Sequence, residues 1–289
     1  MSKGKLMNLS AMAIFGTIGV FVRHIPLPSS LIALARASVG LVFLILVLAV
    51  NRQRPDFCGI RRHFPALLLG GVLLGANWIA LFESYRRTCV AVATVCYYMA
   101  PILVLLAAPV LLHERLSLRQ GCCAGTAMLG MILVSAPWEA DASLSGIAFG
   151  LLAAALYAGV ILCNRHLTGL PPFDTTLVQL MASAAVLTPY VLLNENLAAL
   201  APAPGVLALL LVVGVVHTGV CYTLYFGSLD HLPAQTAALF SYIDPVVAIL
   251  LSAFFLGEPM GLLGAMGAAL VLGSTLVSEL PEGKLFVNN

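Results

Sequence analysis

The chain has 289 residues, of which 61% are hydrophobic and only 9% are charged. Soluble domains are typically about 45–50% apolar and about 25% charged, so most of this chain must have lipid as its solvent. The net charge of +2 gives no reason to expect a nucleic-acid partner. The composition therefore excludes a soluble globular domain and predicts an all-α polytopic transmembrane protein.

Ten apolar runs follow one another along the chain, separated by charged residues, prolines or glycines. A transmembrane helix needs about 20 mostly apolar residues. The ten predicted spans cover residues 6–25, 30–50, 64–85, 89–112, 117–136, 144–163, 174–193, 205–226, 234–256 and 259–280. The first span follows Lys3 and Lys5 and lacks a clear cleavage site, so we expect it to be retained rather than removed as a signal peptide.

The basic residues of the loops are unevenly distributed between the two sides. If the N-terminus is inside, the inner segments hold Lys3, Lys5, Arg52, Arg54, Arg61, Arg62, Arg115, Arg119, Arg165 and Lys284. The outer segments hold only Arg23, Arg86 and Arg87. Because inner loops of membrane proteins are enriched in Lys and Arg, both termini are predicted to be cytoplasmic, in a bacterial-type inner membrane.

An internal repeat with an offset of 144 residues links the two halves. The matched pairs are Tyr98 with Tyr242, Pro101 with Pro245, Glu114 with Glu258, Phe82 with Phe226 and Ser84 with Ser228. Slightly shorter offsets match Phe15 with Tyr157 and Arg36 with Gln179. We therefore predict two halves, residues 1–138 and 139–289. Each half has five spans, an odd number, so the second is inverted in the membrane, a plan typical of secondary transporters.

Several short motifs carry a resemblance to a known family. They are Asn77-Trp78 with Phe82 and Tyr85, Tyr97-Tyr98-x-x-Pro101, the segment 111–116 (LLHERL), Tyr242-x-x-Pro245 and Leu256-Gly257-Glu258-Pro259. The chain resembles, over nearly its whole length, the ten-helix EamA-type members of the drug/metabolite transporter superfamily. The resemblance implies transport of amino acids, other metabolites or drugs without ATP hydrolysis. It also implies a cavity between spans 1, 3, 4, 6, 8 and 9, with spans 5 and 10 at the periphery.

Asp244 is the most informative polar residue, because an ionisable side chain inside a membrane costs several kcal/mol. It immediately precedes Pro245, which removes a backbone donor and should kink the helix. A carboxylate beside exposed carbonyls suits a cationic group or a coupling proton. The alternative is a structural Asp that bonds to a neighbouring helix.

Other polar and aromatic residues near the middle of spans complete the predicted substrate-binding set. The set is Asn77, Trp78, Tyr98, Tyr157, Gln179, His217, Tyr242 and Asp244. Tyr98 and Tyr242 lie three residues before their prolines and are suited to stacking a substrate, although ordinary packing is an alternative. For Asn77 and His217 the alternative is a hydrogen bond between helices.

Three further groups are predicted to act mechanically or structurally. Pro101 and Pro245 weaken helices that bend between states, unless their kinks are static. Arg36 and Glu83 either pair with each other or guard the outer mouth of the protein. Glu114 and Glu258 end their spans and are expected to bond backbone donors at the start of the next helix.

Sequence signatures of enzymes and metal sites are missing. The chain has no P-loop, no H-E-x-x-H, no nucleophile elbow and no dinucleotide fingerprint, and its seven cysteines lack metal-ligand spacing. We predict a secondary or facilitated transporter of a small polar metabolite, without cofactor or metal. Export of an amino acid or a similar metabolite is the leading candidate activity. The rivals are a membrane enzyme acting on a lipid-linked substrate and a channel. The expected partners are the substrate, the bilayer and, as one option, a coupling proton; monomer and homodimer both stay open.

Overall fold

The computed structural model describes residues 3–111, 118–135, 143–197, 202–229, 231–232, 240–258 and 260–279, and these ranges contain helices and no strands. The helices of the first half are α1 (Lys3–Arg23), α2 (Ser29–Val50), α3 (Phe57–Arg62), α4 (Phe64–Arg87), α5 (Val90–Tyr97), α6 (Ala100–Leu111) and α7 (Leu118–Ser135). Those of the second half are α8 (Leu144–Arg165), α9 (Pro172–Asn194), α10 (Pro204–Gly214), the π-helical η2 (Val215–Val220), α11 (Cys221–Leu229), α13 (Ile243–Phe255) and α14 (Leu262–Glu279).

These helices correspond to the ten predicted spans, and the predicted all-α bundle is confirmed. Seven helical segments of the described chain are long and apolar enough to cross a membrane, and the shorter apolar helices 121–133, 243–255 and 262–277 supply the other three. The short helix α3 was not predicted. It lies between the second and third spans, and the Asp56 carboxylate caps it by accepting a hydrogen bond from the Gly59 amide at 3.0 Å.

Two spans are interrupted at matched tyrosines. The fourth span stops being helical at Tyr98 and Met99 and resumes at Ala100, and the ninth has a turn at Tyr242 before α13 begins. Each break lies just before Pro101 or Pro245, which cannot supply a helical amide hydrogen. The eighth span is continuous but passes through the π-helical turn η2, a feature often found at functional sites.

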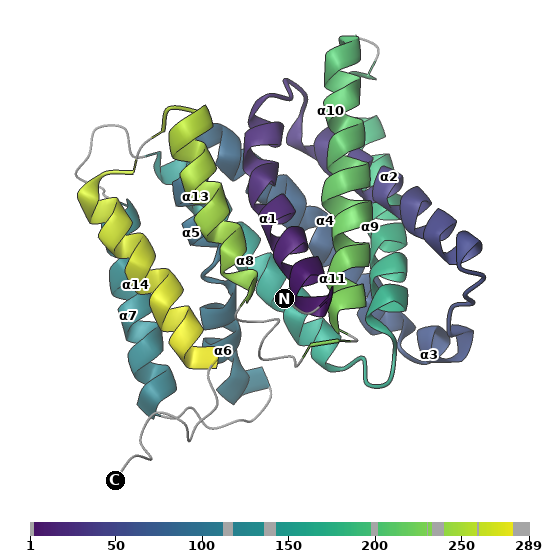
Figure 1. Cartoon of the computed structure of the whole chain (residues 1–289), viewed down its shortest axis with the longest axis horizontal. Helices are drawn as coiled ribbons and strands as arrows, with labels where there is room; N and C mark the ends of the chain where they lie inside the picture. The colour runs from purple at the N-terminus through teal and green to yellow at the C-terminus, as the bar shows by residue number, and fades with distance from the viewer. Residues whose placement is uncertain are drawn as a thin grey trace.

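The main contacts between the two halves come in corresponding pairs. Figure 1 shows how the helices are arranged. The contact of α1 with α13 corresponds to the contact of α8 with α5 and α6. In the same way, the contact of α4 with α8 corresponds to that of α11 with α1. The contact of α4 with α9 corresponds to that of α2 with α10 and η2. The peripheral helices α7 and α14 pack on each other at one edge of the bundle. The described part of the chain is therefore two related five-span units that interlock.

Two matched serines show the same symmetry in individual hydrogen bonds. The Ser84 hydroxyl of α4 donates to the Gly146 carbonyl of α8 at 2.7 Å. Its counterpart Ser228, at the end of α11, accepts from the Asn8 amide of α1 at 2.8 Å. Both bonds are buried and join the third span of one half to the first span of the other, so the two interfaces between halves are built alike.

Glycine permits the closest approach between the halves. A Cβ atom on Gly16 of α1 would lie 2.5 Å from the carbonyl oxygen of Asp244 in α13. At Gly71 of α4 it would lie 2.5 Å from the Ala182 side chain of α9. Because real Cβ contacts are never so short, these helices touch at these points only because the residue is glycine.

Candidate substrate site

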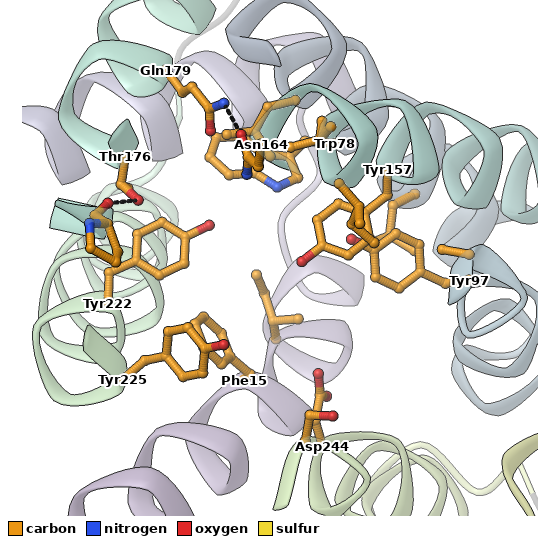
Figure 2. Close-up of a pocket in the computed structure, with 18 of the residues that line it drawn as sticks. Phe15, Trp78, Tyr97, Tyr157, Asn164, Thr176, Gln179, Tyr222, Tyr225 and Asp244 are labelled. Carbon is orange, nitrogen blue, oxygen red and sulfur yellow. Dashed lines mark hydrogen bonds between the residues drawn. The ribbon is translucent and has the colours of Figure 1, made fainter. Parts of the chain in front are cut away.

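A cavity of about 640 Å³ lies between the two halves (Figure 2). Its walls come from α1, α2, α4, α5, α6, α8, α9, α11 and the start of α13. The volume is within the usual range of small-molecule sites, about 300–1,000 Å³. The aromatic residues that line it are Phe15, Trp78, Tyr85, Tyr97, Tyr98, Tyr157, Tyr222, Tyr225 and Phe226. The wall is therefore apolar over most of its surface and carries hydroxyl groups.

The cavity reaches one end of the bundle and stops short of the other. Towards the junction of α8 and α9, which we call the Arg165 end, its wall includes the exposed residues Asn164 and Pro172. Towards the opposite end, which we call the Arg23 end, its last lining residues are Tyr85 and Thr94, both buried. The structure therefore has a cavity that opens at the Arg165 end.

A layer of polar contacts closes the Arg23 end. Arg23 forms an ion pair with Glu258, with 2.8 Å between Nη2 and Oε1, and its other terminal nitrogen donates to the Tyr85 carbonyl. The second carboxylate oxygen of Glu258 accepts from the Val90 amide at 3.1 Å and from the Ser252 hydroxyl at 2.9 Å. This Arg23–Glu258 cluster joins the ends of α1, α4 and α13 to the start of α5.

Asp244 lies in the first turn of α13 and faces the cavity (Figure 2). The Tyr98 hydroxyl lies 3.1 Å from its Oδ2 and 2.9 Å from the Ser241 carbonyl oxygen. Pro245 has no amide hydrogen to give to that carbonyl four residues earlier, so the tyrosine of the other half supplies a donor there. Helix N-termini also favour negative charge, so the break before α13 creates a place for a carboxylate.

Arg36 of α2 lines the cavity although its side chain is only 5% exposed. Its Nε donates to the Thr218 hydroxyl of η2 at 3.0 Å, and its guanidinium lies 4.2 Å above the ring of Trp78. In the described ranges ion pairs are formed by Arg23 and Arg87, and Arg36 has no carboxylate within 4.0 Å. Arg36 and Glu83, one of the predicted pairings, therefore do not meet.

Three other predicted residues line the wall, two of them from α8 and α9. Gln179 donates from its amide to the Asn164 oxygen at 2.7 Å (Figure 2). Tyr157 packs on Tyr97 of α5 with ring centres 5.3 Å apart. Pro101 also contributes to the wall. Tyr157 and Gln179 thus face the cavity from the half opposite to Trp78, and their role in binding stays a prediction.

Some predicted substrate-binding residues lie outside the cavity wall. Asn77 is fully buried and donates to the Ala153 carbonyl of α8 at 2.6 Å, the bond between helices that was the alternative for this residue. The His217 Nε2 lies 2.7 Å from the Thr17 hydroxyl of α1, and its ring packs edge-on against Phe21. Both therefore connect helices behind the wall.

The remaining predicted residues flank the cavity or the Arg23 end. Tyr242 packs beside Tyr98, with ring centres 6.1 Å apart, and Pro245 is buried. Glu83 accepts from the Ser29 hydroxyl at 2.7 Å and pairs with Arg87 at 3.0 Å. Glu258 bonds the start of α5, in the other half, whereas the sequence suggested the start of the next helix. Glu114 lies outside the described residues.

Sequence reasoning overlooked part of the wall. Tyr222 and Tyr225 come from the eighth span, whose high hydrophobicity gives little sign of which face is turned inward. The signal that was available is the repeat itself, because Trp78 and Tyr222 are separated by the same 144 residues as the other matched pairs. Their equivalent positions would have placed Tyr222 opposite Trp78.

Two interlocked helical units around a shared cavity are an architecture typical of multi-pass membrane transporters. Comparison with protein families gives the same class: the model described as "EamA-like transporter family" matches residues 2–136 and again residues 144–279. The chain belongs to this family, part of the drug/metabolite transporter superfamily. The suspected resemblance is confirmed, and the family covers the chain in two repeats.

Individual relatives agree with the family assignment. The chain is 30% identical to "Uncharacterized transporter YxxF" of Bacillus subtilis (strain 168), over 95% of this chain and 89% of the relative. It is 27% identical to an "Uncharacterized transporter" of Archaeoglobus fulgidus, over 96% and 97% of the two chains. A solved crystal structure with 19% sequence identity superposes with a TM-score of 0.65, covering 95% of this chain and 96% of that one, which supports the fold.

Proposed function

We propose that this protein is a secondary transporter that moves a small polar metabolite by alternating access, with export of an amino acid as its first candidate activity. The observation that carries the proposal is a cavity between two symmetry-related halves that is open at one end and closed at the other. Alternating access requires such a site, enclosed by elements that can exchange two related arrangements.

The symmetry of the packing suggests how the second state arises. The contacts of α1 with α13 correspond to those of α8 with α5 and α6. If the halves exchange conformations, the interface that is now tight opens and its counterpart closes. The breaks before Pro101 and Pro245 give the fourth and ninth spans points at which to bend. The cavity would then open at the Arg23 end.

The distribution of charge supports export as the direction of transport. The Arg165 end carries the loop with Arg52, Arg54, Arg61 and Arg62, and inner loops are the ones enriched in basic residues. On this orientation the termini are cytoplasmic in a bacterial-type inner membrane, and the cavity faces the cytoplasm. A site that loads from the cytoplasm fits an exporter.

The chemistry of the wall supports a polar substrate of metabolite size. About 640 Å³ holds a molecule of a few to some tens of atoms, and tyrosine rings combine apolar surface with hydroxyl groups. Among the described residues, Asp244 is the carboxylate that lines the cavity. It is the candidate partner for a cationic group of the substrate, or for a coupling proton if transport uses one.

Counterflow in proteoliposomes tests this function. Purified protein is reconstituted into vesicles preloaded with one unlabelled L-amino acid at a time, and uptake of the same labelled amino acid is followed. A transporter gives saturable accumulation above that of protein-free vesicles. A channel would instead give non-saturable flux and conductance across a planar bilayer. If neither amino acids nor a wider panel of nucleosides, polyamines and cationic drugs shows counterflow, the proposed function is wrong.

A further inference from the structure

We infer that Arg36 binds the carboxylate of the transported molecule, and that Asp244 faces a positively charged group of the same molecule. The substrate class is therefore a small molecule with both an acidic and a basic group, such as an α-amino acid. This inference rests on the proposed transport function and assigns the parts of the cavity that recognise the substrate.

The first argument is the cost of an arginine at this depth. Arg36 is almost completely buried within α2, a membrane-spanning helix. Its contacts with the Thr218 hydroxyl and the Trp78 ring restrain the guanidinium, and the Tyr222 side chain lines the same cavity. These partners are neutral and leave the charge uncompensated at close range. A buried arginine in such a setting is suited to an anion that arrives with the ligand.

The second argument is that the geometry pre-orients the guanidinium. Its position over the Trp78 ring and the bond from Nε to Thr218 restrain the guanidinium from two sides. Thr218 lies within the π-helical turn η2, which packs on α2. A planar, pre-oriented guanidinium binds a carboxylate through two parallel hydrogen bonds with little loss of entropy. A lysine at this position would lack that fork.

The third argument comes from the repeat. Some matched residues that hold the halves together are alike, as Tyr98 and Tyr242 or Ser84 and Ser228 are. The two cavity charges have no such counterparts: Arg36 matches Gln179, and Asp244 matches Ala100, and all four line the cavity. Because the positive charge of Arg36 and the negative charge of Asp244 each occur in only one half, they suit a ligand whose two ends differ in charge.

The fourth argument is the separation of the two charges. Arg36 and Asp244 attract each other across the cavity but do not form an ion pair within 4.0 Å. A molecule that carries both charges can lie between them, with each of its charges against the opposite one. Because the pair and such a ligand are each neutral overall, the occupied cavity keeps no net charge while the halves move, which limits the electrostatic cost of crossing the membrane.

The test uses the contact between Arg36 and Trp78. The chain has two tryptophans, Trp78 and Trp138, so Trp138→Phe leaves a single tryptophan that touches the proposed anion site. Purified Trp138→Phe protein is titrated with L-threonine, L-leucine and L-phenylalanine, and in parallel with the carboxamide of each. We expect at least one free acid to change the tryptophan fluorescence saturably and to raise the melting temperature. Its carboxamide should bind about tenfold more weakly or worse.

Variants locate the effect. Arg36→Gln should abolish the preference for acid over carboxamide, and Arg36→Lys should restore part of it. Arg61→Gln, which removes an exposed arginine on α3, is the matched control and should behave as the parent protein. If Arg36→Gln does not fold, the comparison of acid with carboxamide in the parent protein still tests whether the cavity recognises a carboxylate. Equal binding of the two, or no response to any of the acids, overturns the assignment of Arg36.

The counterflow assay separates this inference from the proposed function. Saturable transport of amino acid carboxamides as fast as of the free acids would overturn the role of Arg36 and leave the transport function standing. Acid-selective binding without any flux would support the role of Arg36 and overturn the proposed transport of these ligands. Acid-selective binding together with acid-selective flux supports both.

Discussion

Arg23, at the end of α1 in the first half, forms an ion pair of 2.8 Å with Glu258, which lies three residues beyond the end of α13 in the second half. The pair lies beyond the closed end of the cavity, and Glu258 also binds the amide of Val90 at the start of α5. It therefore joins the halves on the side that must separate if the cavity is to open there. The side chains are only partly buried, 33% and 16% exposed, so water can replace the contacts when they break.

Breaking this pair should favour the state that opens at the Arg23 end. Cys89, which precedes Val90, is half-buried beside the cluster and reports on that opening. In a protein whose other six cysteines are alanine, Glu258→Gln should increase the labelling rate of Cys89 by an impermeant maleimide roughly tenfold. A charge-assisted hydrogen bond contributes about 1.5–3 kcal/mol, enough for a shift of this size.

The labelling experiment has two internal controls. Glu258→Gln removes a negative neighbour of the Cys89 thiol, and Arg23→Gln removes a positive one, so their direct electrostatic effects on thiol reactivity are opposite. A faster rate in both therefore reports exposure. Glu83→Gln breaks a pair at the same end that lies within one helix and should leave the rate unchanged. Equal acceleration by Glu83→Gln would mean that the pair between halves has no special role.

Asp244→Asn should abolish transport while leaving expression and folding intact. Asparagine keeps the size of the side chain and can still accept from the Tyr98 hydroxyl, but it has no charge for a cationic group and no proton to exchange. Flux in proteoliposomes is the measurement, with the elution profile of the purified protein as the check on folding. Asp56→Asn, an exposed N-cap that asparagine can replace, should transport normally. Normal flux through Asp244→Asn would remove this residue from the mechanism.

Asn77→Ala should weaken the fold more than it weakens substrate binding. The buried bond from Asn77 to the Ala153 carbonyl joins α4 to α8, and interhelical hydrogen bonds in membranes contribute about 0.6 kcal/mol on average, with a maximum near 2. We expect a melting temperature a few degrees lower, with an unchanged KM for whatever substrate is transported. A large increase in KM at an unchanged melting temperature would place Asn77 at the substrate instead.

Gly16→Ala should impair transport although residue 16 does not line the cavity. The added methyl group would meet the Asp244 carbonyl at 2.5 Å and the Val247 side chain at 2.7 Å, so α13 and its carboxylate must move. We expect a several-fold loss of flux at similar protein yield. Gly273→Ala in the peripheral helix α14 meets nothing within 4 Å and should keep full flux. Similar losses in both variants would show that the close contact of α1 with α13 is unimportant.

The sequence was sufficient for the spans and the repeat because both depend on composition and order along the chain. A run of about 20 apolar residues has few alternatives to a membrane helix. The repeat can be recognised because the matched tyrosines and prolines keep the same spacing in both halves. The short helix α3 was not predicted because it lies in a polar loop, where a single capping aspartate is the main sequence signal for a helix. The hydrogen bond from the Val90 amide to Glu258 was not predicted because the two residues are distant in sequence.

Depth in the membrane can be read from the sequence, but the direction in which a side chain points cannot. Asn77 and Trp78 are neighbours at one depth of α4, and both were expected to face a substrate. In the structure Trp78 lines the cavity and Asn77 is turned towards α8. Successive residues point about 100° apart on a helix, so two neighbours can have different surroundings, as these two do. Which of the two faces the cavity is set by the rotation of α4 against its neighbours.

The amino-acid sequence alone determined that this is a ten-span membrane protein made of two repeated halves, since hydrophobic length and residue spacing are properties of the chain itself. Only the tertiary structure decided that Arg36 and Asp244 share one cavity while His217 and Asn77 hold helices together. The reason is that both outcomes are contacts between helices far apart in sequence. Their partners are selected by close packing between the halves, which in places only glycine permits.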